Sequence, residues 1–95
     1  MAKYKLSSNA KEDLRRIYIY GFESFGEKQA DLYYAGFFEA FERISDNPLA
    51  YPTIDSIRLG YRRCPCGSDS IYFRINDNIV EIMAILGGQD ADLWL

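Results

Sequence analysis

The chain has 95 residues, of which 48% are hydrophobic and 16% aromatic, with a net charge of −3. A hydrophobic fraction this high excludes an intrinsically disordered chain, and the length predicts one domain over residues 1–95. The sequence pI of about 4.8 argues against a protein whose main affinity is for nucleic-acid phosphates, so no direct, specific nucleic-acid binding is expected.

A short strand and a long helix are predicted at the start of the chain. Residues 3–6 alternate between polar and apolar side chains, which is typical of a strand with one buried face. Ser7 and Ser8 each offer a helix N-cap. The apolar residues that follow recur at helical spacing and predict a helix over residues 8–24. This stripe consists of Ala10, Leu14, Ile17, Tyr18 and Gly21.

A second helix is predicted over residues 27–46. Gly26 suits the end of the first helix and a tight turn, and Asn47-Pro48 ends the second because the residue before proline avoids helical geometry. The two helices form a hairpin. The apolar stripe of the second helix is Ala30, Tyr33, Tyr34, Phe37, Phe38, Phe41 and Ile44, of which the three phenylalanines are expected in the core.

Three strands are predicted after a proline-containing loop at residues 47–57. They cover residues 57–64, 69–75 and 79–86, and the polar residues 76–78 suit a hairpin turn. The last run is apolar on both faces, as a central strand should be. The order β-α-α-β-β-β predicts an α+β domain, in which the helical hairpin packs on a small twisted antiparallel sheet.

Cys64 and Cys66 do not suggest a metal or redox site. Residues i and i+2 of a strand share a face, where disulfide geometry is poor. The chain contains no histidine, so two thiols cannot complete a zinc shell without carboxylates. We interpret them as two buried or half-buried thiols, and we expect neither a metal nor a cofactor.

The positive charge is concentrated in one segment. Residues 58–74 hold four arginines against the single acid Asp69, whereas residues 75–95 contain neither Lys nor Arg. A solvated strand face would explain this concentration of positive charge as well as a binding surface would. Arg62 could form a surface ion pair with Asp69 or Glu81, and Arg74 could have a structural role.

The element order and three stretches of sequence resemble the RelE/ParE toxin superfamily across the whole chain. The order and spacing of these stretches are more specific than any one of them. They are Leu6-Ser-Ser-Asn-Ala10 with Asp13-Leu14 and Ile17, Asn47-Pro48 with Ile57-Arg58-Leu-Gly60-Tyr61-Arg62, and Pro65-Cys-Gly67-Ser68 with Ile71-Tyr72-Phe73-Arg74, Ile85-Leu86 and Gln89-Asp90.

The resemblance implies one of two activities. RelE-like members are ribosome-dependent mRNA endonucleases, and ParE-like members poison DNA gyrase. RNA cleavage needs groups that transfer protons and positive charge on the phosphate. This chain has Asp69 and Gly87 where relatives often have histidine, and Ala84 where RelE-like enzymes have arginine. We therefore favour a gyrase-directed toxin without catalytic residues over a nuclease, with an inactive, antitoxin-binding member as a third alternative.

A gyrase-directed toxin would bind its target through a few aromatic or arginine anchors. Trp94 could instead fold back and cap the sheet. The predicted target-binding residues are Arg58, Arg62, Arg63, Gln89, Asp90 and Trp94.

The resemblance also implies a neutralising partner, a ParD-like antitoxin of the ribbon-helix-helix class. A sheet covered on one face leaves a surface for a wrapping helix or an added strand. Aromatic residues of the two helices could form the docking groove. The predicted antitoxin-binding residues are Tyr18, Tyr20, Phe22, Tyr33 and Tyr34.

The sequence also predicts where the protein works. No apolar run approaches the roughly 20 residues that a membrane helix needs. The first residues include no apolar signal-peptide region. A cytoplasmic location without membrane contact is therefore expected.

Overall fold

The computed structural model describes residues 4–87, and its element order confirms the predicted β-α-α-β-β-β arrangement. The predicted bounds of the second helix match the structure, and those of the first differ by one residue. The elements are β1 (Tyr4–Leu6), α1 (Ser8–Phe25), α2 (Glu27–Asp46), the short 3-10 helix η1 (Pro48–Ala50), β2 (Tyr61–Cys66), β3 (Asp69–Asn76) and β4 (Ile79–Leu86).

The four strands form one sheet in the order β1-β4-β3-β2. Strands β2, β3 and β4 are antiparallel, as predicted, but β1 runs parallel to β4. The sheet is therefore mixed and not wholly antiparallel. The direction of β1 follows from the crossover, because the whole helical hairpin lies between β1 and the other strands. Periodicity within a strand carries no information about that direction.

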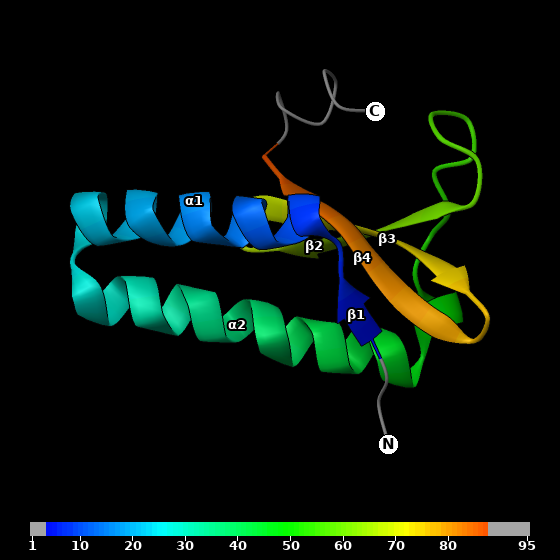
Figure 1. The fold of residues 1–95 in the computed structure, drawn as a ribbon, viewed down its shortest axis with the longest axis horizontal. Coiled ribbons are helices and arrows are strands. Elements are labelled where there is room, and N and C mark those ends of the chain that lie inside the picture. Colours follow the sequence, from blue (N-terminus) through cyan, green and yellow to red (C-terminus); the bar gives the residue numbers. More distant parts are fainter. Residues whose placement is uncertain (1–3, 88–95) are drawn as a thin grey trace.

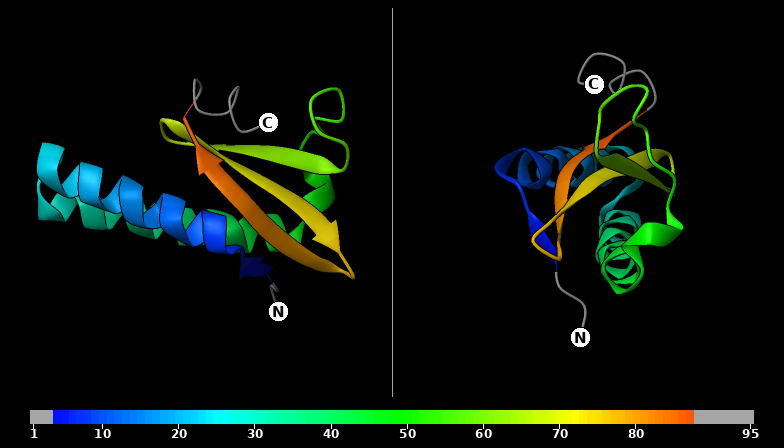
Figure 2. Two further views of the ribbon diagram at one scale, coloured as in Figure 1. Left: turned by 45° about the horizontal axis from the view of Figure 1, so that its top comes forward. Right: turned by 90° about the vertical axis from the view of Figure 1, so that its right-hand side faces the viewer.

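The two helices cover one face of the sheet, and the main core lies between them and the strands (Figures 1 and 2). Phe37 and Phe41 of α2 are fully buried there, as predicted, and Phe38 packs at the edge of this core. From the sheet the core receives Ile71, Phe73, Val80, Ile82 and Ile85. A smaller cluster on the opposite face of the sheet contains Tyr61, Tyr72, Ala84 and Leu86.

The first strand after the loop begins later than predicted. Residues 57–60 form a turn in which the Asp55 carboxylate accepts a hydrogen bond of 2.8 Å from the Gly60 amide. Gly60 has a φ of 82°, which breaks an extended run. Pro65, predicted to lie in a connection, belongs to β2. Proline is tolerated there because β2 is an edge strand.

The start of α1 completes the hydrogen bonding of β4 beyond the end of β1. Ser7 caps the helix by accepting from the Ala10 amide at 3.0 Å, and its hydroxyl donates to the Met83 carbonyl at 3.0 Å. A register shift at this point of β3 and β4 leaves Met83 as an extra residue. Further along, the Asp13 carboxylate accepts from the Ile85 amide at 2.9 Å. Side chains of α1 thus take the place of a missing strand.

The helical hairpin projects beyond the sheet at the end where α1 and α2 meet (Figure 1). Residues on this end have few strand neighbours, and large apolar side chains remain exposed. Ile19 is 45% exposed, Tyr20 65%, Phe22 49% and Phe25 68%. Among the helices of residues 4–87, none is long and apolar enough to cross a membrane.

Candidate functional site

A groove lies in the corner between the projecting helical hairpin and the end of the sheet. It encloses about 650 Å³ and has mainly aromatic and apolar walls. Helices α1 and α2 supply most of the lining, and the β2–β3 turn and the end of β4 close its inner side. The lining residues are Arg16, Ile17, Tyr18, Tyr20, Gly21, Phe25, Gln29, Ala30, Tyr33, Tyr34, Ser68, Asp69 and Gly87.

Tyr33 joins α2 to the β2–β3 turn at the inner side of this groove. Its hydroxyl donates to the Asp69 carboxylate at 2.8 Å and accepts from the Ser68 amide at 3.0 Å. Burial, together with the hydrogen bond to Asp69, raises the pKa of Tyr33 to about 12. The hydroxyl therefore stays protonated at neutral pH and holds the Asp69 side chain in place.

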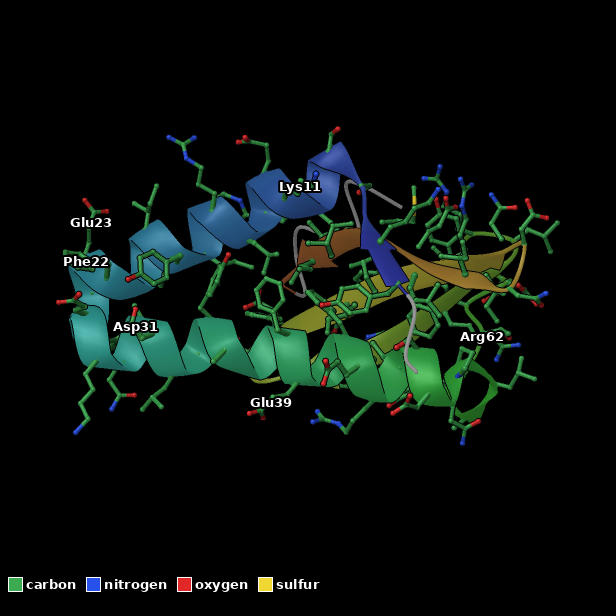
Figure 3. The ribbon with its side chains drawn as sticks, turned by 60° about the horizontal axis from the view of Figure 1, so that its bottom comes forward. Lys11, Phe22, Glu23, Asp31, Glu39 and Arg62 are labelled. Carbon is green, nitrogen blue, oxygen red and sulfur yellow. The ribbon has the colours of Figure 1, made fainter. Side chains whose placement is uncertain are left out.

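Four of the five predicted antitoxin-binding residues line the groove. They are Tyr18, Tyr20, Tyr33 and Tyr34. The fifth, Phe22, lies near the tip of the hairpin with its ring centroid 6.3 Å from that of Tyr18 (Figure 3). Phe22 is therefore a neighbour of the groove and not part of its lining.

Tyr18 and Tyr34 also border a second, smaller hollow of about 560 Å³ between the two helices. The Tyr18 hydroxyl donates to the Asp31 carboxylate at 2.7 Å across this hollow. Its other lining residues include Leu6, Leu14 and Phe38. This hollow is more open and lacks contributions from β2, β3 and β4.

The predicted basic strip does not form one surface. Partners across an antiparallel pair share a face, so Arg63, opposite Tyr72, lies on the face away from the helices. Arg62, opposite Phe73, lies on the helical face, and its guanidinium donates to the Tyr51 carbonyl at 2.6 Å. Arg58, in the turn before β2, places its guanidinium carbon 4.8 Å from the centroid of the Tyr61 ring.

The carboxylates proposed as partners of Arg62 are used elsewhere, so that interpretation was wrong. Glu81 binds Arg74 at 2.7 Å and Lys5 at 3.1 Å, and Asp69 binds the Tyr33 hydroxyl. Arg74 thus has an ion-pair partner on the neighbouring strand β4, and its structural role stays a prediction. Hydrogen bonds from Arg74 and Lys5 lower the pKa of the Glu81 carboxyl.

Gln89, Asp90 and Trp94 lie outside the described residues. Cys64 is buried and Cys66 half-buried, and both are free thiols whose pKa is raised by burial. Within residues 4–87, no group of three potential ligands is placed to hold a metal ion.

The sequence matches the family described as "ParE toxin of type II toxin-antitoxin system, parDE" over residues 4–91. This match includes both helices, all four strands and every lining residue of the groove. The chain belongs to the ParE toxin family.

Individual relatives agree with this assignment. The toxin is 35% identical to Toxin ParE1 of Caulobacter vibrioides over 86 residues, which are 90% of this chain and 88% of that protein. It also matches the structure titled "Chromosomal ParDE TA system from P. aeruginosa", with a TM-score of 0.80, 20% identity, and coverage of 92% of this chain and 96% of that chain.

A second solved structure shares the fold at lower similarity. The RelBE2 toxin-antitoxin complex of Mycobacterium tuberculosis matches with a TM-score of 0.59 and 18% identity, covering 92% of this chain and 98% of that one. At this identity the likeness shows a shared fold. It supports the RelE/ParE-like architecture that the sequence predicted.

The structural contacts of two acidic residues of this ParE toxin were not predicted from the sequence, which suggested Asp69 only as an ion-pair partner of Arg62. Asp13 lies on the apolar stripe of α1, three residues after Ala10 and one before Leu14, so a buried charge could have been suspected there. Asp69 gives no such signal, because its partner Tyr33 is 36 residues away. Only the fold brings the side chains of Asp69 and Tyr33 together.

Proposed function

We propose that this ParE toxin inhibits DNA gyrase by binding it, and that a ParD-like antitoxin neutralises the toxin by covering the aromatic groove. The family to which it belongs is described as the toxin of a type II toxin-antitoxin system, parDE. The solved relative from P. aeruginosa carries the same pair of names in its title. The toxin–antitoxin role follows from the family, and the gyrase target and the docking site are the proposed steps.

The exposed aromatic surface of the groove carries the docking proposal. Tyr20 and Phe25 leave about two-thirds of their surfaces in water, at 65% and 68% exposure. A contiguous hollow lined by such side chains is typical of a protein-binding surface, since burying aromatic rings provides most of the energy at binding hot spots. An amphipathic antitoxin helix is the partner shape that such a groove fits best.

The chemistry of the described residues supports binding over RNA cleavage. The sequence contains no histidine. The Glu81 carboxyl on the outer sheet face has a lowered pKa, whereas a general base works best with a pKa near neutrality. The raised pKa of Cys64 and Cys66 keeps both as thiols, which are poor nucleophiles.

The three arginines among the proposed target-binding residues do not line the groove. Arg62 is found at the end of the molecule opposite to Phe22 and the helical tip (Figure 3). Arg58 and Arg63 lie near it in the chain but on the outer face. We propose these arginines, with Gln89, Asp90 and Trp94, as anchors for gyrase, and none of the three arginines lines the groove proposed to receive the antitoxin.

The test adds purified toxin to gyrase with relaxed plasmid DNA and ATP, and separately to translating ribosomes with mRNA. We expect loss of supercoiling with accumulation of linear DNA, intact mRNA, and recovery of supercoiling when the antitoxin of the adjacent reading frame is added. The triple variant Arg58→Ala/Arg62→Ala/Arg63→Ala should lose gyrase inhibition and still bind antitoxin. Codon-linked mRNA cuts with normal supercoiling would overturn the gyrase proposal.

A further inference from the structure

The inner side of the aromatic groove carries one uncompensated negative charge. Asp69 lines the groove and is half-buried. Its side chain accepts from the Tyr33 hydroxyl, a neutral donor, and no salt bridge to it is found among residues 4–87. A carboxylate that is partly removed from water and lacks a cationic partner favours a positive ligand.

The basic residue of the groove does not supply that partner. Arg16 also lines the hollow, but its guanidinium forms an ion pair of 3.2 Å with Asp13 Oδ1. Asp13 in turn is fixed by the Ile85 amide and by Asn9. The charges of Arg16 and Asp13 offset each other, which leaves Asp69 as the charge that an occupant of the groove must match.

The geometry of Asp69 leaves room for such an occupant. Its Oδ2 accepts the hydrogen bond from Tyr33 at 2.8 Å, which fixes the plane of the carboxylate. Its Oδ1 lies 3.7 Å from the point where a Cβ atom would stand on Gly87. Since Gly87 has no side chain, the space between it and this oxygen is not filled by one. The rings of Tyr20, Phe25 and Tyr34 line the same groove and add faces that attract cations.

We propose that the groove recognises a basic side chain, arginine or lysine, on an otherwise apolar segment of the antitoxin, with Asp69 as its anionic contact. The identity of the partner as the antitoxin rests on the function proposed above. The preference of the groove for a cation flanked by apolar groups does not. Asp69 is thus a specificity residue of the docking surface, and Tyr33 positions it.

The first experiment tests the groove without any antitoxin. The probes are 2-phenylethylguanidine and its neutral analogue 2-phenylethylurea, titrated into the toxin while backbone amide shifts are followed by NMR. We expect the guanidine to bind at least about fivefold more tightly than the urea, with the largest shifts at Ser68, Asp69 and Gly87. Equal binding of the two probes would overturn the inference.

A matched pair of variants assigns the effect to one carboxylate. Asp69→Asn keeps an acceptor for Tyr33 and removes the charge, so it should abolish the difference between the probes. Asp31→Asn is the control, because Asp31 also accepts from a tyrosine hydroxyl but lines only the second hollow. Asp31→Asn should leave the difference intact. A preference for the guanidine that survives in Asp69→Asn would contradict the assignment.

The second experiment uses the antitoxin of the adjacent reading frame. Each of its Lys and Arg residues is changed to Ala and measured against wild-type toxin and Asp69→Asn in a double-mutant cycle. We expect one basic position whose effect on Kd, about tenfold, disappears in the Asp69→Asn background. Wild-type binding with no coupled position would overturn the inference and leave the antitoxin proposal standing, whereas absence of binding by wild-type toxin would contradict the antitoxin proposal itself.

Discussion

Asp13 is the residue on which the junction between α1 and the sheet depends. Its carboxylate accepts from the Ile85 amide at 2.9 Å, from Asn9 at 3.3 Å and from Arg16 at 3.2 Å. The Ile85 amide lies on the edge of β4 beyond the end of β1. Without Asp13 this buried N–H would have no acceptor, because β1 does not extend that far. A buried donor without an acceptor lowers the stability of the fold.

We therefore expect Asp13→Ala to lower the free energy of unfolding by about 1–3 kcal/mol, the cost of an unsatisfied buried donor. Asp13→Asn keeps an acceptor oxygen for Ile85 and should cost less. Glu12→Ala is the control, since its ion pair with Arg15 spans 3.8 Å between two largely exposed side chains, and its effect should stay within about 0.5 kcal/mol. Urea denaturation measures all three. Similar losses for Glu12→Ala and Asp13→Ala would refute this role for Asp13.

Because of Glu81, the stability of the protein should decrease at acid pH. Its pKa in the folded protein lies below the ordinary value of 4.5 because Arg74 and Lys5 bond to its ionised form. A lowered folded-state pKa means that the unfolded chain takes up the proton first as the pH falls. The stabilisation is complete above pH 4.5 and is lost as the pH falls through the lowered value.

Glu81→Gln should accordingly be less stable than the wild type at pH 7, and the difference should shrink as the pH falls below 4.5. Urea unfolding at several pH values between 3 and 7, with ionic strength held constant, measures this difference in the free energy of unfolding. Raising the salt concentration at pH 7 should also narrow the gap, because Arg74 and Lys5 are partly exposed. A gap independent of pH would show that the charge of Glu81 contributes nothing.

At the scale of elements, the β2–β3 hairpin is fixed to α2 through its turn. Gly67 has a φ of 61°, in the region that favours glycine. The Tyr33 ring packs directly on it, so that a Cβ atom on Gly67 would overlap the ring. The turn thus needs glycine for its backbone conformation and also for the approach of a helix.

This double requirement can be separated by comparing two glycines. Gly60 has a similar positive φ of 82° but nothing within 4 Å of its virtual Cβ, so Gly60→Ala should cost about 1–2 kcal/mol from backbone strain alone. Gly67→Ala should cost about 1–3 kcal/mol more, because Tyr33 must move. Thermal and urea unfolding of both variants test this. Equal losses of unfolding free energy in the two variants would mean that the Tyr33 ring moves aside without destabilising the protein.

At the scale of the whole molecule, the helices are longer than the sheet that they cover. Figure 2 shows the helical hairpin extending beyond the strands. Aromatic side chains on this overhang, such as Tyr20 and Phe25, are exposed and line the groove. These exposed apolar side chains do not contribute to the buried core of this 95-residue domain. The same surface should therefore matter for antitoxin affinity and little for the stability of the free toxin.

Tyr20→Ser tests this separation, since Tyr and Ser have similar helix propensities. Tyr20 is 65% exposed, so the free energy of unfolding should change by no more than about 0.5 kcal/mol. Antitoxin affinity should fall by about tenfold or more, as for an aromatic anchor. The control is Leu32→Ser, because Leu32 is 61% exposed on α2 and lines neither hollow. Calorimetric titration measures both, and equal affinities of the two variants would contradict the groove as the docking site.

The sequence by itself determined the elements, because their signals act over a few residues. Ser7, Gly26 and Asn47 bound the two helices close to their predicted ends, and the turn at Asp77 and Asn78 has the positive φ values that these residue types tolerate. The aromatic stripes also pointed to the lining of the groove. Repeats of helical or strand spacing reveal which side of an element is buried, and this needs no knowledge of its neighbours.

Only the tertiary structure decided which elements meet. The parallel pairing of β1 with β4, the division of Arg58, Arg62 and Arg63 between surfaces, and the contact of Tyr33 with Asp69 all join residues whose relation depends on strand register and crossover direction. These are set by the packing of the complete chain, since one residue of register moves every side chain of a strand to the opposite face. Local sequence is compatible with either face until the rest of the molecule has folded against it.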